Sequence, residues 1–151
     1  MSFPDLNLPA YPFKIQAGEQ RSKIFDPVRK KYVALTPEEW VRQHFVQFLV
    51  NNKGCPASLI AIEQGLKLNK RNKRSDVVVY TTTGNPVLIV ECKAPEVKIS
   101  QEVFHQVAAY NMTLKVPLLV VTNGLQHYCC RIDHEQKTYA FLPDIPQWDT
   151  M

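Results

Sequence analysis

The fold of this chain is decided by residues 75–93, which read Ser75-Asp-Val-Val-Val-Tyr-Thr-Thr-Thr-Gly-Asn-Pro-Val-Leu-Ile-Val-Glu-Cys-Lys93. Two apolar, β-rich runs flank the turn-forming residues Thr83-Gly84-Asn85-Pro86, a pattern that predicts two paired antiparallel strands. The turn brings Asp76, which opens the first run, back to Glu91 and Lys93 at the end of the second. The stretch therefore predicts two carboxylates and a lysine at one edge of a sheet.

These three side chains are the candidate catalytic group. On a strand, Glu91 and Lys93 project from the same face while Cys92 projects from the other. Mg²⁺ prefers carboxylate oxygens and usually takes one or two of them together with waters and a phosphate oxygen. We predict Asp76 and Glu91 as metal ligands and Lys93 as the residue that positions the attacking water. Taken singly, each is better explained as a turn cap or as part of an ion pair at a strand edge.

The rest of the chain supplies helices and further strands. Thr36-Pro37-Glu38-Glu39 has the form of a capping box, and apolar residues at helical spacing extend this first helix to about Asn52. Ser100 is placed to cap a second helix that runs to about Leu114. The other predicted strands cover residues 59–68, 118–122, 126–133 and 137–142. The sequence thus predicts an α/β (α+β) fold in which helices flank a central mixed sheet.

Length and composition limit the organisation of the chain. The 151 residues are 45% hydrophobic and 21% charged, enough for one compact core and too short for two domains. Residues 1–35 are rich in proline and lack a sustained period, so we expect an irregular arm before a single domain at 36–151. Lys and Arg outnumber Asp and Glu by 18 to 14, an excess that suits a polyanionic partner but also suits most soluble proteins.

The compartment follows from two absences in the sequence. The amino terminus lacks the features of a signal peptide, and no apolar run approaches the roughly 20 residues that span a bilayer, which predicts a cytoplasmic protein without membrane contact. The cysteines have no framework spacing and are expected to be free thiols. A zinc site made of His127, Cys129, Cys130 and His134 is an alternative, disfavoured because adjacent cysteines on a strand point to opposite faces.

The spacing of the candidate residues resembles the bipartite motif of the PD-(D/E)XK nucleases. Asp76, residues 77–90 and Glu91-x-Lys93 match it, and Ser75 stands where proline is often found. Four stretches extend the resemblance, over about residues 24–142, to the amino-terminal nuclease domain of type I restriction enzyme R subunits: Phe25-Asp-Pro-Val-Arg-Lys-Lys-Tyr-Val33, Thr36-Pro-Glu-Glu-Trp-Val-Arg-Gln43, Glu91-Cys-Lys-Ala-Pro95 and Thr122-Asn-Gly124. The resemblance implies a restriction-endonuclease-like core of order αβββαβ plus C-terminal strands, with Mg²⁺, or Mn²⁺ in its place, as cofactor.

The resemblance also implies two site residues on the second helix. Gln106-Val-Ala-Ala-Tyr110 has the Gln-x-x-x-Tyr pattern of RecB-like members of the superfamily, and residues four apart share one helix face. Gln106 and Tyr110 would then line the site and contact nucleic acid or brace Lys93. The alternative is an ordinary amphipathic helix with a buried tyrosine.

An acid near the start of the first helix is further implied to face the metal. Glu38 matches this role because it lies three residues before Val41, on the apolar stripe, whereas Glu39 is explained by the capping box. Glu63, on the strand before Asp76, is a weaker candidate that solvent exposure or pairing with a lysine would also explain.

Two functions stay open on the sequence, beside a distant third in which the site binds a small phosphorylated molecule, disfavoured because no Gly-rich phosphate turn opens either helix. The first is a Mg²⁺-dependent endonuclease that hydrolyses DNA phosphodiester bonds, favoured because both carboxylates and the lysine are present. The second is a non-cleaving nucleic-acid-binding or assembly module, recruited through the basic segment 67–74, which a solvated turn explains equally well. Type I R subunits continue into a motor, but no Gly-rich phosphate loop occurs here, so we expect action alone, as a homodimer, or beside a separate motor or specificity subunit.

Overall fold

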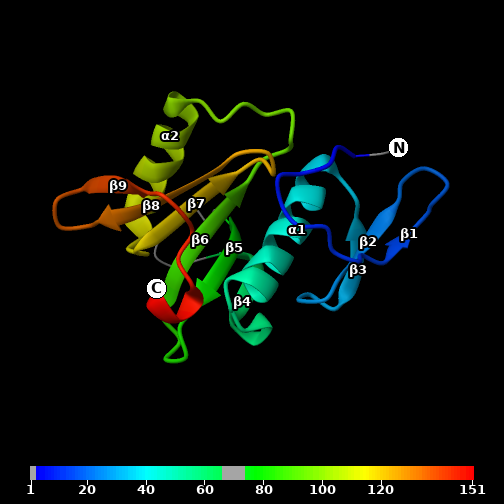
Figure 1. Ribbon diagram of the computed structural model, residues 1–151, viewed down its shortest axis with the longest axis horizontal. Coiled ribbons are helices and arrows are strands. Elements are labelled where there is room, and N and C mark those ends of the chain that lie inside the picture. The colour runs from blue at the N-terminus through cyan, green and yellow to red at the C-terminus, as the bar shows by residue number, and fades with distance from the viewer. Residues whose placement is uncertain (1–2, 66–73) are drawn as a thin grey trace.

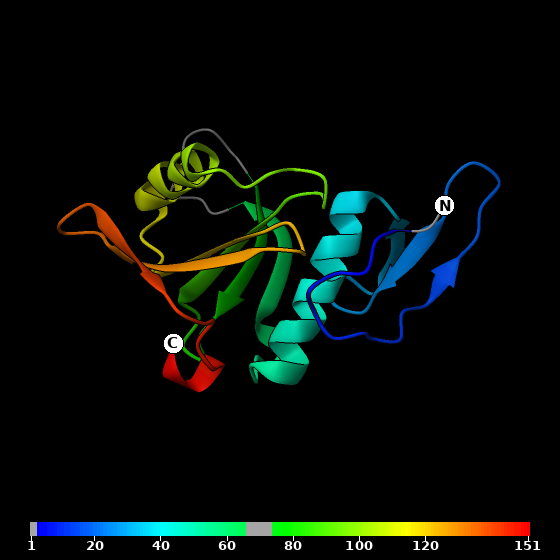
Figure 2. The ribbon, with the colours of Figure 1, turned by 45° about the horizontal axis from the view of Figure 1, so that its top comes forward.

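The computed structural model describes residues 3–65 and 74–151, without the side chains of 63–65 and 74–75. The central elements are α1 (Pro37–Asn52), β4 (Ile60–Gly65), β5 (Arg74–Tyr80), β6 (Pro86–Cys92), α2 (Gln101–Asn111), β7 (Leu118–Thr122), β8 (His127–Asp133) and β9 (Thr138–Leu142). Before them come β1 (Ile15–Gln16), β2 (Lys23–Asp26) and β3 (Lys31–Ala34), and short 3-10 turns lie at η1 (Ala57–Leu59), η2 (Met112–Leu114) and η3 (Trp148–Thr150). Helix α1 stands between the large central sheet and the small amino-terminal sheet (Figures 1 and 2).

The central sheet has the strand order β4-β5-β6-β7-β8-β9, and each neighbouring pair is antiparallel except β6 with β7. A parallel pair needs a crossover connection, and α2 lies in the segment that joins the end of β6 to the start of β7. The predicted order of helix, three strands, helix, strand and further strands is confirmed, and so is the mixed sheet.

Strand β6 is buried on both of its faces. Leu88 and Val90 pack in the core beneath α1, whereas Ile89 packs in the core beneath α2. The two helices therefore cover opposite faces of the sheet (Figure 1). A slip of one residue in the strand pairing would exchange these two sets of side chains, so burial on both faces specifies the register strongly.

Both predicted helix starts are found in the structure. Thr36 Oγ1 accepts the N–H of Glu39 at 3.0 Å, and Ser100 Oγ caps α2 through an equivalent hydrogen bond of 3.1 Å. The end of the second helix differs, because the sequence predicts it near Leu114 whereas α2 ends at Asn111 and the chain tightens into η2. Such 3-10 turns are frequent at the carboxyl ends of α-helices.

The prediction of an irregular arm over residues 1–35 is wrong for its second half. β2 pairs with β1 and β3 in a small antiparallel sheet. Asp26 forms the turn between β2 and β3, where its Oδ1 accepts the N–H groups of Val28 and Arg29 at 2.8 and 3.0 Å. Strands of two to four residues are too short to show an apolar alternation, so the sequence pattern does not reveal them.

The first described residues, 3–14, contain no strand and are tied to the loop after β7. The Asn7 N–H donates a hydrogen bond of 2.8 Å to the carbonyl oxygen of Gly124. Gly124 has a φ of +86°, and a Cβ there would lie 2.7 Å from Leu6. The left-handed backbone conformation requires glycine, whereas the Leu6 side chain could move away from a Cβ.

Replacement of Phe45 by alanine tests the core between α1 and the sheet. The ring is fully buried and lies 5.6 Å from Phe48 and 5.7 Å from His127, centroid to centroid. We expect Phe45→Ala to lower the free energy of unfolding by about 3–5 kcal/mol, measured by urea denaturation. The same change at Phe141, which is 56% exposed, should lower it by less than about 1 kcal/mol. Equal losses at the two positions would contradict this account of the core.

Candidate metal centre

Asp76 lies against the end of β6. Val77 pairs with Val90, so Asp76 stands opposite Glu91 at the end of the β5–β6 pair. The Asp76 Oδ2 atom accepts the backbone N–H of Cys92 at 2.7 Å. A charge-assisted hydrogen bond from the main chain therefore orients this carboxylate.

Glu91 and Lys93 carry the charges at the carboxyl end of this strand. Glu91 is 7% exposed and alternates with Cys92, which packs beneath α1, so Glu91 is on the face of the sheet covered by α2. The Lys93 N–H donates to the Thr122 carbonyl oxygen at 2.8 Å, which continues the pairing of β6 with β7. The half-buried Lys93 side chain is close enough for its positive charge to act on Glu38.

The two glutamates at the start of α1 have exchanged the environments that the sequence predicts. The carboxylate of Glu39 is 7% exposed and accepts hydrogen bonds from Arg29, Arg42 and Gln43 at 2.9, 2.6 and 3.0 Å. The Glu38 side chain is 46% exposed. The inward placement predicted for Glu38 is therefore wrong. Thr36 caps the Glu39 N–H as the capping box predicts, but the carboxylate of Glu39 pairs with the two arginines.

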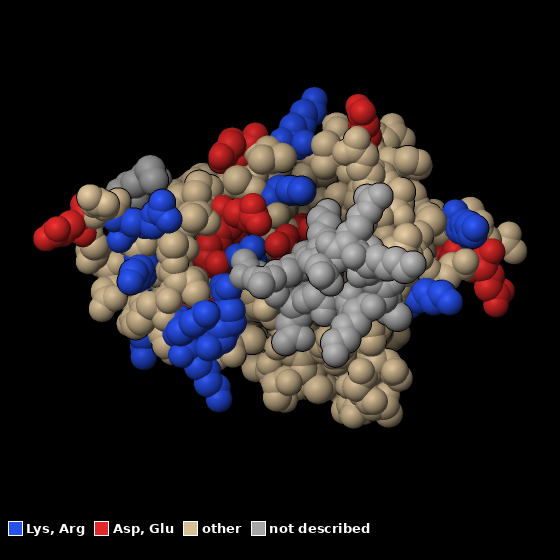
Figure 3. Space-filling view, turned by 180° about the vertical axis from the view of Figure 1, so that it is seen from behind, with Lys and Arg blue, Asp and Glu red and all other residues tan. Residues whose placement is uncertain are grey.

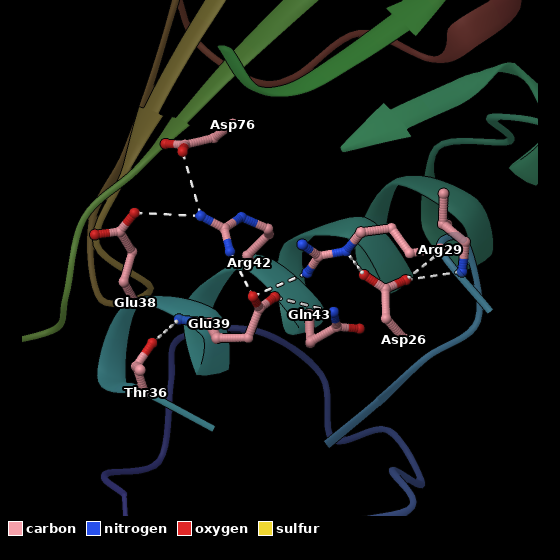
Figure 4. A network of polar contacts seen from close by, with 9 residues as sticks. Asp26, Arg29, Thr36, Glu38, Glu39, Arg42, Gln43 and Asp76 are labelled. Carbon is pink, nitrogen blue, oxygen red and sulfur yellow. Dashed lines mark hydrogen bonds and ion pairs between the residues drawn. The ribbon is translucent and has the colours of Figure 1, made fainter. Parts of the chain in front are cut away.

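Arg42 joins α1 to the sheet, and the sequence pattern does not single it out as a site residue. Its Nη2 atom lies 3.2 Å from Glu38 Oε1 and 3.2 Å from Asp76 Oδ1, while Nη1 donates to Glu39 (Figure 4). The signal that could have found it is charge spacing, because Arg42 is three and four residues after the two glutamates. One guanidinium thus brings Glu38 and Asp76 together at the end of β6.

The charges around Glu38 act on its proton affinity. Burial and the nearby negative charge of Asp76 raise the pKa of Glu38, and the positive charges of Arg42 and Lys93 oppose this shift. Burial is the larger cause of the rise, and repulsion by the Asp76 carboxylate adds to it. This is the electrostatic situation that a bound cation relieves.

The two predicted residues of α2 differ in exposure. Gln106 is exposed on α2, and Tyr110 packs partly against the core on the face of Glu91. Within the described part of the chain, no hydrogen bond joins Gln106 to Asp76, Glu91 or Lys93. The side chain of Glu63 and residues 66–73 of the basic segment lie outside the described residues.

The side chains of the zinc alternative do not form one group. Both ring nitrogens of His127 and of His134 lie within hydrogen-bond distance of protein oxygens. Cys129 packs in the core beneath α1, whereas Cys130 packs in the core beneath α2. The four cysteines are free and buried, and burial raises the pKa of Cys129 to about 11.

The arrangement at the end of β6 fits a hard divalent cation. Glu38 and Asp76 each direct an oxygen at one positively charged nitrogen of Arg42, so the two carboxylates already share a cation. Among the described side chains, no three His, Cys, Asp or Glu residues group as a complete metal cage. Mg²⁺ needs only one or two carboxylates because it keeps several waters. Asp76, which stands opposite Glu91 and shares Arg42 with Glu38, could take part in such a set.

Comparison with known proteins places the chain in a family. Residues 37–146 match the family described as the type I restriction enzyme R protein N terminus. The chain belongs to this family. The R-protein N-terminal match includes α1 with Glu38 and Arg42, both carboxylates of the β5–β6 pair, and α2.

A solved structure shows the same fold as this R-protein N-terminal domain. It is a fragment described as an HsdR subunit of a type I restriction enzyme from Vibrio vulnificus, with a TM-score of 0.53 and 19% sequence identity. The match covers 76% of this chain and 24% of that chain. No curated protein sequence matches the chain. Within residues 3–65 and 74–151, no helix has the length and apolarity needed to cross a membrane.

The raised pKa of Glu38 predicts a pH-dependent effect of Glu38→Gln in metal-free buffer. A carboxyl whose pKa is higher in the folded state than in the unfolded state contributes stability at pH values below its unfolded pKa. This contribution is lost as the pH rises through the folded pKa. Because the side chain is 46% exposed, screening limits the effect, and we expect the variant to be more stable at about pH 7 by less than about 0.5 kcal/mol.

The difference should close by about pH 3, below the unperturbed pKa of a glutamate, where wild-type Glu38 is protonated in both states. Urea denaturation at the two pH values measures it, with Glu135→Gln in the exposed turn before β9 as the control. A variant that is less stable than wild type at neutral pH would contradict the assignment of repulsion at this site.

Proposed function

We propose that this domain is a Mg²⁺-dependent nuclease that hydrolyses DNA phosphodiester bonds. The observation that carries the proposal is the position of Asp76, whose two carboxylate oxygens contact the Cys92 N–H and Arg42. Asp76 stands opposite Glu91 in the β5–β6 pair, and Arg42 links it to Glu38. Membership of the R-protein N-terminal family supports the proposal, since the PD-(D/E)XK motif of the sequence lies inside the matched region.

Each charged residue has a definite task in the proposed reaction. Asp76 and Glu91 would hold the ion, with Glu38 at its side, and the main-chain hydrogen bond keeps Asp76 oriented. Bound Mg²⁺ lowers the pKa of water and neutralises charge on the phosphate. Lys93 would orient the attacking water by a hydrogen bond.

The surface charge suits approach of a polyanion to an acidic site. On the face turned away in Figure 1, acidic side chains form a group bordered by lysine and arginine side chains (Figure 3). The chain carries a formal net charge of +4, which attracts DNA at low ionic strength. The match covers 24% of the structural relative. Our proposal includes action of this domain together with other subunits of a type I enzyme.

A second candidate function is a non-cleaving nucleic-acid-binding or assembly module. The observation that favours it is the pairing of Arg42 with Asp76 and Glu38, because an arginine that neutralises both carboxylates stabilises the domain without any metal. The two candidates differ in whether a divalent ion binds at this site and whether DNA is cut.

A cleavage assay separates them. We expect the purified protein to cut linear, circular or single-stranded DNA with Mg²⁺ or Mn²⁺ and not with EDTA. Asp76→Ala, Glu91→Ala and Lys93→Ala should each reduce the rate by at least about a hundredfold, because each removes a group that acts on the phosphate, the ion or the water.

Asp149→Ala is the matched control, since Asp149 is an exposed acid in η3 outside the site, and it should leave the rate unchanged. Metal-dependent cutting that survives loss of Asp76 would disprove the site. A wild-type protein that binds the ion and DNA but never cuts would favour the non-cleaving module.

The role of α2 is tested by Gln106→Ala. If Gln106 contacts nucleic acid, loss of one hydrogen bond of about 1 kcal/mol should weaken DNA binding roughly fivefold. Gln101→Ala is the matched control because Gln101 is an exposed glutamine at the start of the same helix. Binding of a fluorescent duplex in Ca²⁺ measures both variants. Equal affinities for wild type and both variants would remove Gln106 from the site.

A further inference from the structure

We infer that Arg42 is an internal counter-ion of the metal centre, which competes with the divalent cation for Asp76 and Glu38 and so weakens its binding. The inference rests on the proposed function, because it concerns the same carboxylates. It assigns to a buried arginine on α1 the control of how readily the site accepts an ion.

The contacts of Arg42 place its charge where the ion would bind. Nη2 lies 3.2 Å from one oxygen of Asp76 and 3.2 Å from one oxygen of Glu38. Two carboxylates that converge on one nitrogen make a site for a single positive charge, whether it belongs to a guanidinium or to a metal ion. A divalent cation at these oxygens must share them with Arg42 or displace it.

Arg42 is held in this position by Glu39, which contacts the other guanidinium nitrogen. Its side chain is 6% exposed, and Nη1 donates to Glu39 Oε1 at 2.6 Å. Glu39 is itself fixed by Arg29 at 2.9 Å and Gln43 at 3.0 Å, and Arg29 is paired in turn with Asp26 in the turn between β2 and β3 (Figure 4). A buried charge with such partners does not move freely to solvent, so the competition is built into the fold.

The neighbouring contacts allow the charge of Arg42 to be removed without dismantling the site. Asp76 keeps its orientation through the 2.7 Å hydrogen bond from the Cys92 N–H. Glu39 keeps Arg29 and Gln43 as partners, so its buried carboxylate is still compensated. A role limited to structural support predicts that loss of Arg42 weakens metal binding, whereas competition predicts the opposite.

The test is calorimetric titration of the full chain with Mn²⁺ and with Mg²⁺, in the absence of DNA. We expect Arg42→Gln to bind the ion roughly tenfold more tightly than wild type, because a fixed positive charge beside the ion is gone. Arg42→Lys keeps the charge and should stay within about threefold of wild type. Arg131→Gln is the matched control, because Arg131 is exposed on β8 and pairs with Leu118, at the other end of β7 from Thr122, and it should leave the affinity unchanged.

A second measurement needs no variant at position 42. In protein labelled with ¹⁵N-arginine, addition of Mg²⁺ should shift the guanidinium signal of Arg42, whose bonds to Asp76 and Glu38 change, and leave that of the exposed Arg131 in place. This readout keeps the inference testable if Arg42→Gln fails to fold, as judged by circular dichroism.

The outcomes separate the inference from the proposed function. Tighter binding by Arg42→Gln, including binding by this variant alone, supports the inference. If wild type binds the ion, Asp76→Ala does not, and Arg42→Gln binds equally or more weakly, the metal centre stands and the inference is overturned. An Arg42 signal that does not respond to a bound ion also overturns it. Absence of ion binding in both wild type and Arg42→Gln overturns the metal centre together with the inference.

Discussion

The antiparallel register of β5 on β6 is the constraint on which the site depends. It sets Asp76 opposite Glu91, where the Cys92 N–H holds the carboxylate at 2.7 Å. The register is fixed by burial of β6 on both faces, since a one-residue slip would turn the side chains beneath α1 toward α2. The same apolar packing that stabilises the sheet therefore positions the charged residues at its end.

A chain of buried and half-buried charges then links the amino-terminal sheet to this point. It runs from Asp26 through Arg29, Glu39 and Arg42 to Asp76. Buried ions destabilise a fold unless each has a partner of opposite charge, and here acids and arginines alternate. The small sheet therefore helps to position Arg42, because Asp26 in its turn binds Arg29, which supports Glu39 and, through it, Arg42.

Membership of the R-protein N-terminal family and the geometry of the acidic group bear on different aspects of function. The family explains why α1, the β5–β6 pair and α2 occur together over residues 37–146. The geometry bears on the chemistry, since function depends on the arrangement of particular side chains rather than on the fold. Arg42 matters for this reason, because its positive charge lies at the carboxylates that the proposed reaction would use.

The sequence by itself determined the strand pairing, both helix starts and the convergence of Asp76 on the end of β6, because turn chemistry, capping residues and apolar runs act over short stretches of chain. Only the tertiary structure decided the environments of Glu38 and Glu39 and the contact of Arg42 with Asp76, 34 positions away in the chain. Those depend on how α1 packs between two sheets, and one of these, built from strands of two to four residues, leaves no periodic pattern to read.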